Sequence, residues 1–340
     1  MSATTLTPVT VLTGFLGSGK STLLNRVLHD ARYADTAVIV NEFGDIPIDH
    51  ALVRRASENV IVLSGGCICC RVAGDLVQAL RDLHFKRAAN EVPAFRRAVI
   101  ETTGLADPAP LLATLIEMPL VAARYALSGV VTTVDGVHGE SALDEHPEAV
   151  KQAAVADRIV VTKADLAAAG ALEALEGRLA ALNPAAPRIR ASSGNVDASW
   201  LFDLGLHRHD GSRPDAAGWL GASEWRSFAP PASRGPHDQR IRSFTWTAPG
   251  PVSWDALEAA LDTLLELRGE RILRLKGLVN VGDTGPVAIH AVQHTLYPPA
   301  KLAEWPDNDR RTRLVFITRD LEAGAIAPIL DSFTSTSSAS

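Results

Sequence analysis

The chain has 340 residues, 46% of them apolar, which is enough to bury one large core and, by size, two. Its 33 lysines and arginines against 39 aspartates and glutamates give a net charge of −6, which excludes a large basic surface for nucleic acid or anionic membrane. No apolar run reaches the length of a membrane span, and residues 1–5 lack the start of a signal peptide, so we expect a cytoplasmic protein.

The first predicted strand, Val9 to Leu12, leads into a phosphate-binding loop. Residues 14–22 read GFLGSGKST and match G-x-x-x-x-G-K-S/T at every fixed position, and a helix-forming run follows. Glycines let the backbone N–H groups point at phosphates, Lys20 can reach the β- and γ-oxygens, and Ser21 can hold Mg²⁺. A chance glycine-rich turn would not need this strand and helix. The predicted nucleotide-binding residues here are Gly14, Gly17, Ser18, Gly19, Lys20, Ser21 and Thr22.

The second predicted strand, residues 36–41, ends in Asn41-Glu42-Phe43-Gly44, at the place of a first switch loop. Its acids are candidates for Mg²⁺, for the waters of Mg²⁺ or for a thiol-bound metal. We assign Glu42 to the transition metal and Asp49 to Mg²⁺. The alternative is that both are ordinary solvated loop acids.

A third strand, residues 59–63, precedes Gly65-Gly66-Cys67-Ile68-Cys69-Cys70, which holds all three cysteines of the chain. Thiolates suit Zn²⁺ and related ions, and three of them leave a tetrahedral ion one ligand short. An incomplete site suits metal transfer better than permanent structural use. A redox-active thiol cluster and buried structural cysteines are the alternatives. In the cytoplasm we expect reduced thiols rather than disulfides.

The strand predicted at residues 98–101 ends in Glu101, and Gly104 follows three residues later. A triphosphatase needs an acid near Mg²⁺, and Glu101 meets that need, because an unpaired carboxylate after a fully apolar run would be costly. The N–H of Gly104 can approach the γ-phosphate. The alternative for Glu101 is a surface carboxylate at a strand end.

A strand at residues 158–162 ends in Thr162-Lys163-Ala164-Asp165, a T-K-x-D sequence. The carboxylate of Asp165 can accept from both N1–H and the 2-amino group of guanine, and the stem of Lys163 can cover the ring. GTP is therefore preferred over ATP. Thr162 occupies the position where asparagine is usual.

The pattern along the chain predicts an α/β fold: a doubly wound, mostly parallel sheet, because continuous apolar strands alternate with helices. We expect the first domain at residues 1–205 and a flexible linker at 206–240, whose histidines we interpret as solvated. A smaller α+β domain follows at 241–331, with helices on one face of an antiparallel sheet and a disordered tail at 332–340. Further predicted elements are strands 130–134, 188–191, 241–247, 271–281, 287–293 and 313–317, and helices 73–86, 108–117, 171–182, 254–267 and 320–330.

With GFLGSGKST, NEFG, GGCICC, ETTGLADP and TKAD in this order, the sequence resembles the CobW-type family of P-loop GTPase metallochaperones. These are relatives of the nickel-insertion GTPases of urease and hydrogenase. The likeness continues through Arg274-Leu275-Lys276-Gly277 and residues 291–294. It implies a GTPase domain with a smaller C-terminal domain, slow GTP hydrolysis, and delivery of Zn²⁺ or Co²⁺ to a client protein. It maps the family's metal motif onto Cys67, Cys69 and Cys70.

We therefore predict a GTPase with Lys20, Glu101 and Gly104 in catalysis, which binds Zn²⁺ or Co²⁺ and passes it to a client metalloprotein or a cobalamin pathway. The nucleotide state is expected to set the metal affinity. Two alternatives are an ATP-dependent kinase with structural zinc and a thiol-based redox regulator. The physiological metal, the client, the catalytic base and the oligomeric state stay open, as does metal ligation by His138, His290 or His294.

Overall fold

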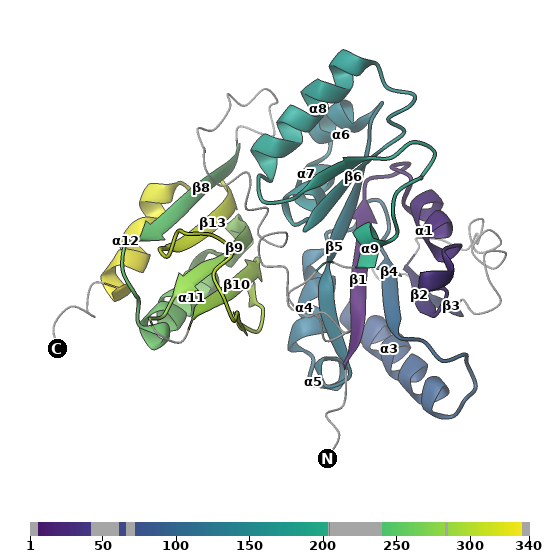
Figure 1. Cartoon of the computed structure of the whole chain (residues 1–340), viewed down its shortest axis with the longest axis horizontal. Coiled ribbons are helices and arrows are strands. Elements are labelled where there is room, and N and C mark those ends of the chain that lie inside the picture. The colour runs from purple at the N-terminus through teal and green to yellow at the C-terminus, as the bar shows by residue number, and fades with distance from the viewer. Residues whose placement is uncertain are drawn as a thin grey trace. The chain divides into compact units, whose positions relative to one another are not determined.

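The computed structural model describes residues 6–41, 61–65, 72–202, 204, 240–282 and 285–334. The chain forms two compact units, one with strands β1 to β7 and the other with strands β8 to β13 (Figure 1). The domain boundaries predicted at residues 205 and 240 stay a prediction, because the segment between them lies outside the described residues.

The first unit contains a seven-stranded sheet in the order β3-β2-β4-β1-β5-β6-β7, and every pairing in it is parallel. The strands are β1 (Thr7–Gly14), β2 (Thr36–Asn41), β3 (Ile61–Gly65), β4 (Arg97–Glu101), β5 (Tyr125–Asp135), β6 (Arg158–Thr162) and β7 (Arg188–Arg190). Strand order reverses at β1, and ligands of such sheets bind at the carboxyl ends of the strands beside the reversal. The predicted doubly wound parallel sheet is confirmed.

Helices cover both faces of this sheet. They are α1 (Lys20–Leu28), η1 (Ala31–Tyr33), α3 (Val72–Ala88), α4 (Ala109–Glu117), α5 (Pro119–Ala122), α6 (Gly139–Glu145), α7 (Pro147–Ala154), α8 (Ala169–Leu182) and α9 (Ser199–Phe202). Apolar side chains of α1 and α9 pack with Leu12, Val38 and Val99 in one core cluster. Because side chains alternate along a strand, Val11 and Ile39 point to the other face, where α4 and α7 contact the sheet.

Strand β5 and the two helices beside the phosphate loop differ from the sequence prediction. Strand β5 begins at Tyr125 rather than at Val130, because its pairing with β1 continues across a register shift that leaves Ser128 unpaired. Helices α6 and α7 are absent from the predicted elements. Each is short, and Pro147 begins the second of them directly after the first ends. None of the described helices combines the length and the apolarity needed to cross a membrane.

The second unit is an antiparallel sheet in the order β11-β10-β9-β13-β8, with β12 paired to β10. Its elements are β8 (Ile241–Ala248), α11 (Trp254–Arg268), η3 (Gly269–Arg271), β9 (Ile272–Asn280), β10 (Pro286–Val292), β11 (Thr295–Leu296), β12 (Ala300–Lys301), β13 (Thr312–Arg319) and α12 (Ala323–Thr334). Side chains of α11 and α12 form one core cluster with Leu275, Ile289 and Phe316 of the sheet. The helices therefore cover one face, as the sequence predicts.

The C-terminal helix extends further than predicted. Residues 332–334, which the sequence prediction gives to a disordered tail, belong to α12, because this helix continues to Thr334. Leu330 is fully buried, and the indole N–H of Trp246 donates to Asp331 at 2.9 Å. These contacts hold the last turns of the helix on the sheet.

Candidate functional site

The loop between β1 and α1 has the backbone that the phosphate-loop pattern requires. Gly14, Gly17 and Gly19 have φ angles of +142°, +70° and +86°, a region that favours glycine. A Cβ at Gly14 would also collide with Thr133 of β5. Gly19 is the N-cap of α1, and glycine has no side chain that could accept from the first N–H groups of that helix. Uncapped N–H groups and the helix dipole favour an anion at this position.

Hydroxyl groups at the carboxyl ends of the strands hold the loop through hydrogen bonds. Ser18 shares a 2.7 Å hydrogen bond with the Thr133 hydroxyl, which also donates to the carbonyl of Thr13 at 3.3 Å. Thr102, just after β4, donates to the Thr13 hydroxyl at 2.8 Å. Thr162, at the end of β6, donates to the carbonyl of Ser18 at 2.7 Å. Four strand ends thus hold the loop, and Thr162 ties it to the T-K-x-D segment.

The structure brings together Ser21 and Glu101, two of the three residues that the sequence assigns to Mg²⁺. The Ser21 hydroxyl donates to Oε1 of Glu101 at 2.7 Å. Glu101 is 5% exposed and lies beside Leu12 in the pairing of β4 with β1. A hydroxyl and a carboxylate at the N-terminus of α1 are hard oxygen ligands of the kind that Mg²⁺ binds next to substrate phosphates. Their role as Mg²⁺ ligands stays a prediction.

Lys20 and Gly104 both lie against the loop. The Lys20 ammonium donates to the carbonyls of Gly14 and Phe15 at 2.7 and 3.2 Å, so it lies within the curve of the loop. A Cβ on Gly104 would lie 2.6 Å from the backbone nitrogen of Leu16, a separation too short for any side chain. Glycine is therefore required where the Glu101–Gly104 segment contacts the phosphate loop.

Lys163 and Asp165 lie at the carboxyl end of β6, as predicted. Lys163 has a φ of +54° and its ammonium pairs with Asp135 at 2.6 Å. Burial acts to raise the pKa of Asp135, but hydrogen bonds from Lys163 and from the N–H groups of Val137 and His138 outweigh it, so its pKa lies below the usual value. The carboxylate of Asp165 is exposed, and therefore open to a ligand.

A neighbouring loop, residues 191–195 after β7, is missed by the sequence analysis. The N–H of Ala164 donates to the carbonyl of Ala191, which places this loop beside the T-K-x-D segment. A Cβ on Gly194 would lie 3.2 Å from Thr22 of α1, and Ser193 has a φ of +51°. Positive φ angles at non-glycine residues cluster at functional sites. Small polar residues directly after a strand of the same parallel sheet were the available signal.

The predicted transition-metal ligands Cys67, Cys69, Cys70 and Glu42 lie outside the described residues, as does Asp49. What the structure places is the strand before the cysteines: Gly65 ends β3 and pairs with Asn41 at the end of β2. The carboxyl ends of both strands lie on the same side of the parallel sheet as the carboxyl end of β1, where the phosphate loop begins. Within the described ranges, no group of three His, Cys, Asp or Glu residues is arranged to hold a metal ion.

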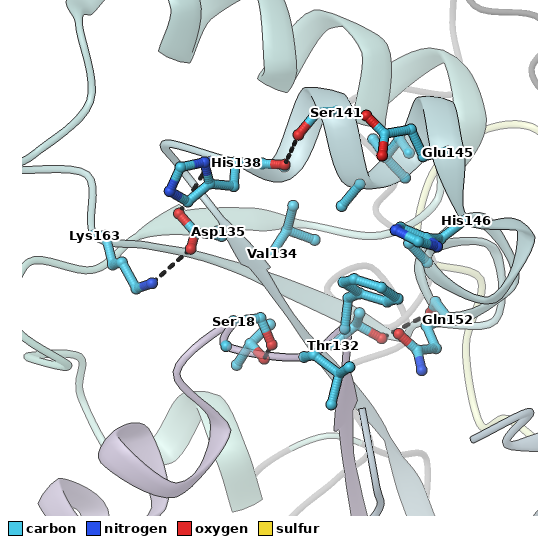
Figure 2. A pocket seen from close by; sticks show the side chains of 18 residues that line it. Ser18, Thr132, Val134, Asp135, His138, Ser141, Glu145, His146, Gln152 and Lys163 are labelled. Atoms are coloured by element: carbon cyan, nitrogen blue, oxygen red, sulfur yellow. Dashed lines mark hydrogen bonds and ion pairs between the residues drawn. The ribbon is translucent and has the colours of Figure 1, made fainter. Parts of the chain in front are cut away.

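A pocket of about 280 Å³ lies between the phosphate loop, the end of β5 and helices α6 and α7. Figure 2 shows Asp135 and Lys163 toward one end of this pocket and His146 and Gln152 toward the other. The rings of Phe15 and His146 stack with centroids 4.3 Å apart. The phosphate loop therefore packs on α6 and α7 as well as on the sheet. His138, an open metal candidate in the sequence, is exposed at the N-cap of α6.

Comparison with known proteins gives matches over both units. A model of the CobW/HypB/UreG nucleotide-binding domain matches residues 8–190, and a model of the C-terminal domain of cobalamin synthesis protein CobW matches residues 241–334. The Escherichia coli (strain K12) protein named zinc chaperone YjiA is 33% identical over 311 residues, 91% of this chain and 93% of that one.

A protein from Sinorhizobium sp named zinc chaperone CobW is 30% identical over 351 residues, 94% of this chain and 95% of that one. A crystal structure of Zn(II)-bound YjiA GTPase from E. coli has a TM-score of 0.69 and 27% identity, covering 96% of this chain and 99% of that one. The likeness thus extends over nearly the full length of both chains.

Proposed function

This chain belongs to the CobW/HypB/UreG family, and from that membership we propose that it is a GTP-hydrolysing zinc chaperone. In this proposal it binds and hydrolyses GTP with Mg²⁺, holds Zn²⁺ through Cys67, Cys69 and Cys70, and passes the ion to a client metalloprotein. The observation that carries the nucleotide half is the contact between Ser21 and Glu101 at the end of the phosphate loop. The names of the relatives support the zinc half.

The residues of the loop fit a Mg²⁺–GTP complex. Ser21 and Glu101 would hold Mg²⁺, which offsets phosphate charge when bound. Lys20 and the N-terminus of α1 bind the phosphate oxygens, and the N–H of Gly104 faces the γ-phosphate. Water then attacks the γ-phosphate in line. Because the protein groups that stabilise the developing charge are already in position before GTP binds, they need not reorganise during the reaction.

The cargo and its destination are the finer part of the proposal. Zn²⁺ and Co²⁺ both accept tetrahedral thiolate ligands, and we favour Zn²⁺ because the relatives are named zinc chaperones. Cobalt, and a client in cobalamin synthesis, are kept as the alternative. A cytoplasmic location, which would keep the thiols reduced, is part of the same proposal.

Replacing Glu101 with glutamine should weaken Mg²⁺-dependent GTP binding by about 10- to 150-fold, since a charged acceptor is worth about 1.5–3 kcal/mol. The amide keeps the size of the side chain but loses the charge that Mg²⁺ requires. A fluorescent GTP analogue titrated with and without Mg²⁺ measures the effect. If GTP binding by the variant depends on Mg²⁺ as strongly as in the wild type, the carboxylate that binds Mg²⁺ is not Glu101.

Replacing Asp165 with alanine should lower GTP affinity by about 10- to 100-fold and leave the weak ATP affinity unchanged, because only guanine donates two hydrogen bonds to this carboxylate. Competition of GTP and ATP against a labelled nucleotide measures both. Asp82→Ala, at a half-exposed acid of α3, is the matched control. Equal affinity for the two bases in the wild type would instead favour the ATP-dependent kinase.

A further inference from the structure

Two adjacent residues of α7 hold the segment that follows Glu101. Gln152 is fully buried, and its side-chain amide donates to the carbonyls of Gly104 and Ala106 at 3.1 and 3.0 Å. Beside it, the Lys151 ammonium pairs with Asp107 at 2.7 Å. Residues 104–107 are thus attached to α7 by two carbonyls and one carboxylate.

The chemistry of Gln152 fixes the direction of its amide. Only the nitrogen can donate, so it must face the two carbonyls, while Oε1 has no hydrogen-bond partner among the described residues. That oxygen belongs to a residue that lines the pocket in Figure 2. The amide nitrogen of Gln152 is therefore the atom that links α7 to residues 104 and 106.

Both ends of this attachment are themselves anchored. The Thr132 hydroxyl of β5 donates to the backbone carbonyl of Gln152 at 2.8 Å, which satisfies a carbonyl in the last turn of α7. On the other side, Asp107 accepts from the N–H of Ala109, where α4 begins. The segment is held between two helices that pack on the sheet.

Gly104 is the point at which this attachment meets the nucleotide site. It lies so close to the backbone of Leu16 that no side chain fits between the two segments. Its carbonyl accepts from Gln152, and the planar peptide group that contains this carbonyl also contains the Gly104 Cα, so holding the carbonyl restrains the Cα to which the Gly104 nitrogen is bonded. A shift of the Gly104 peptide must break a bond to Gln152 or move α7.

We propose that Gln152 is a positioning residue that keeps the Gly104 segment in place to accept a γ-phosphate, and so sets the preference for GTP over GDP. The inference rests on the proposed function and adds a regulation to it: α7 and the pocket beside it respond to the nucleotide bound. GDP has no γ-phosphate and makes no contact that depends on the Gly104 N–H. The two affinities must therefore respond differently to loss of Gln152.

The test is Gln152→Met, which keeps the length and apolar packing but removes both donors. Dissociation constants for GTPγS and GDP, with Mg²⁺, are measured by competition, and kcat and KM for GTP are measured on the same preparations. We expect GTPγS affinity to fall about 10-fold and GDP affinity to change less than about 2-fold. A merely structural role would move both together.

Thr10→Val is the matched control, because it removes a buried hydroxyl-to-carbonyl hydrogen bond, to Leu201, away from the nucleotide loops. It should leave the ratio of the two affinities unchanged. Lys151→Met removes the ion pair with Asp107, which belongs to the same attachment but comes from a partly exposed side chain. It should lower the affinity for GTPγS by about 3-fold and leave the affinity for GDP unchanged. This variant keeps the test available if Gln152→Met does not fold.

Equal losses for GTPγS and GDP in these variants, or no loss in either, would overturn the role of Gln152 while leaving the proposed function standing. A wild-type chain that does not bind GTPγS with Mg²⁺ would instead contradict the proposed function itself.

Discussion

Replacing Lys20 with alanine is expected to reduce the rate of GTP hydrolysis by roughly 100- to 1,000-fold, the usual cost of removing one preorganised group that stabilises transition-state charge. The Lys20 ammonium is buried and lies within the loop, where it donates to the carbonyls of Gly14 and Phe15. The proposed function places the β- and γ-phosphate oxygens beside this ammonium. Single-turnover hydrolysis of labelled GTP measures the rate free of product release.

A control variant must show that loss of one positive charge elsewhere on the protein does not slow hydrolysis. Lys86→Ala removes a lysine from the last turn of α3, outside the loop, and should hydrolyse GTP at the wild-type rate. The hydroxyl network of Ser18, Thr133 and Thr162 does not involve Lys20, so the loop should keep its backbone in the variant. Hydrolysis by Lys20→Ala at more than about a tenth of the wild-type rate would mean that the loop does not position the γ-phosphate.

Replacing Cys69 with serine should weaken Zn²⁺ binding by roughly 100-fold or more, because a thiolate is lost and a serine hydroxyl does not ionise to replace it. The three cysteines are the only ones in the chain. Competition with a chromophoric zinc chelator, under reducing conditions, measures the affinity. Nucleotide binding without zinc should be unchanged, since the phosphate loop contains no cysteine.

The same variant separates the alternatives left by the sequence. Unchanged zinc affinity in Cys69→Ser would place the ion at other ligands and remove the cysteines from the proposal. If oxidation of the wild type alters nucleotide affinity and no stoichiometric zinc is taken up, the thiol-based redox regulator is correct instead.

The sequence predicts the phosphate loop well because its requirements are local. Gly14, Gly19 and Lys20 act through their own backbone and side chain within one turn, and a strand and a helix must flank them. The sequence also predicts that Glu101 has a charged partner, since a carboxylate at the end of a buried strand is costly unless a partner or a cation offsets its charge. The parallel sheet then brings Glu101 to Ser21 without any further signal.

Residues that act through the tertiary fold could not be identified in this way. Gln152 lies 48 positions from Gly104, and nothing in the short helix α7 marks it as a donor to another segment. Asp135 and Lys163 meet only because β5 and β6 are neighbours. Thr162 departs from the usual asparagine, and its contact with Ser18 shows that a hydroxyl can make the link to the phosphate loop. Local patterns in one sequence do not indicate which residues far apart in the chain will contact each other.

We propose that the bound nucleotide sets the zinc affinity, and titration of Zn²⁺ into reduced wild-type protein tests this coupling most directly. Three arms are compared, each with Mg²⁺: GTPγS, GDP and no nucleotide, with Cys69→Ser as the blank. We predict one zinc ion per chain, bound about 5- to 150-fold more tightly with GTPγS than with GDP, the range of a typical coupling free energy. Identical zinc affinity in all three arms would contradict a nucleotide-gated zinc chaperone.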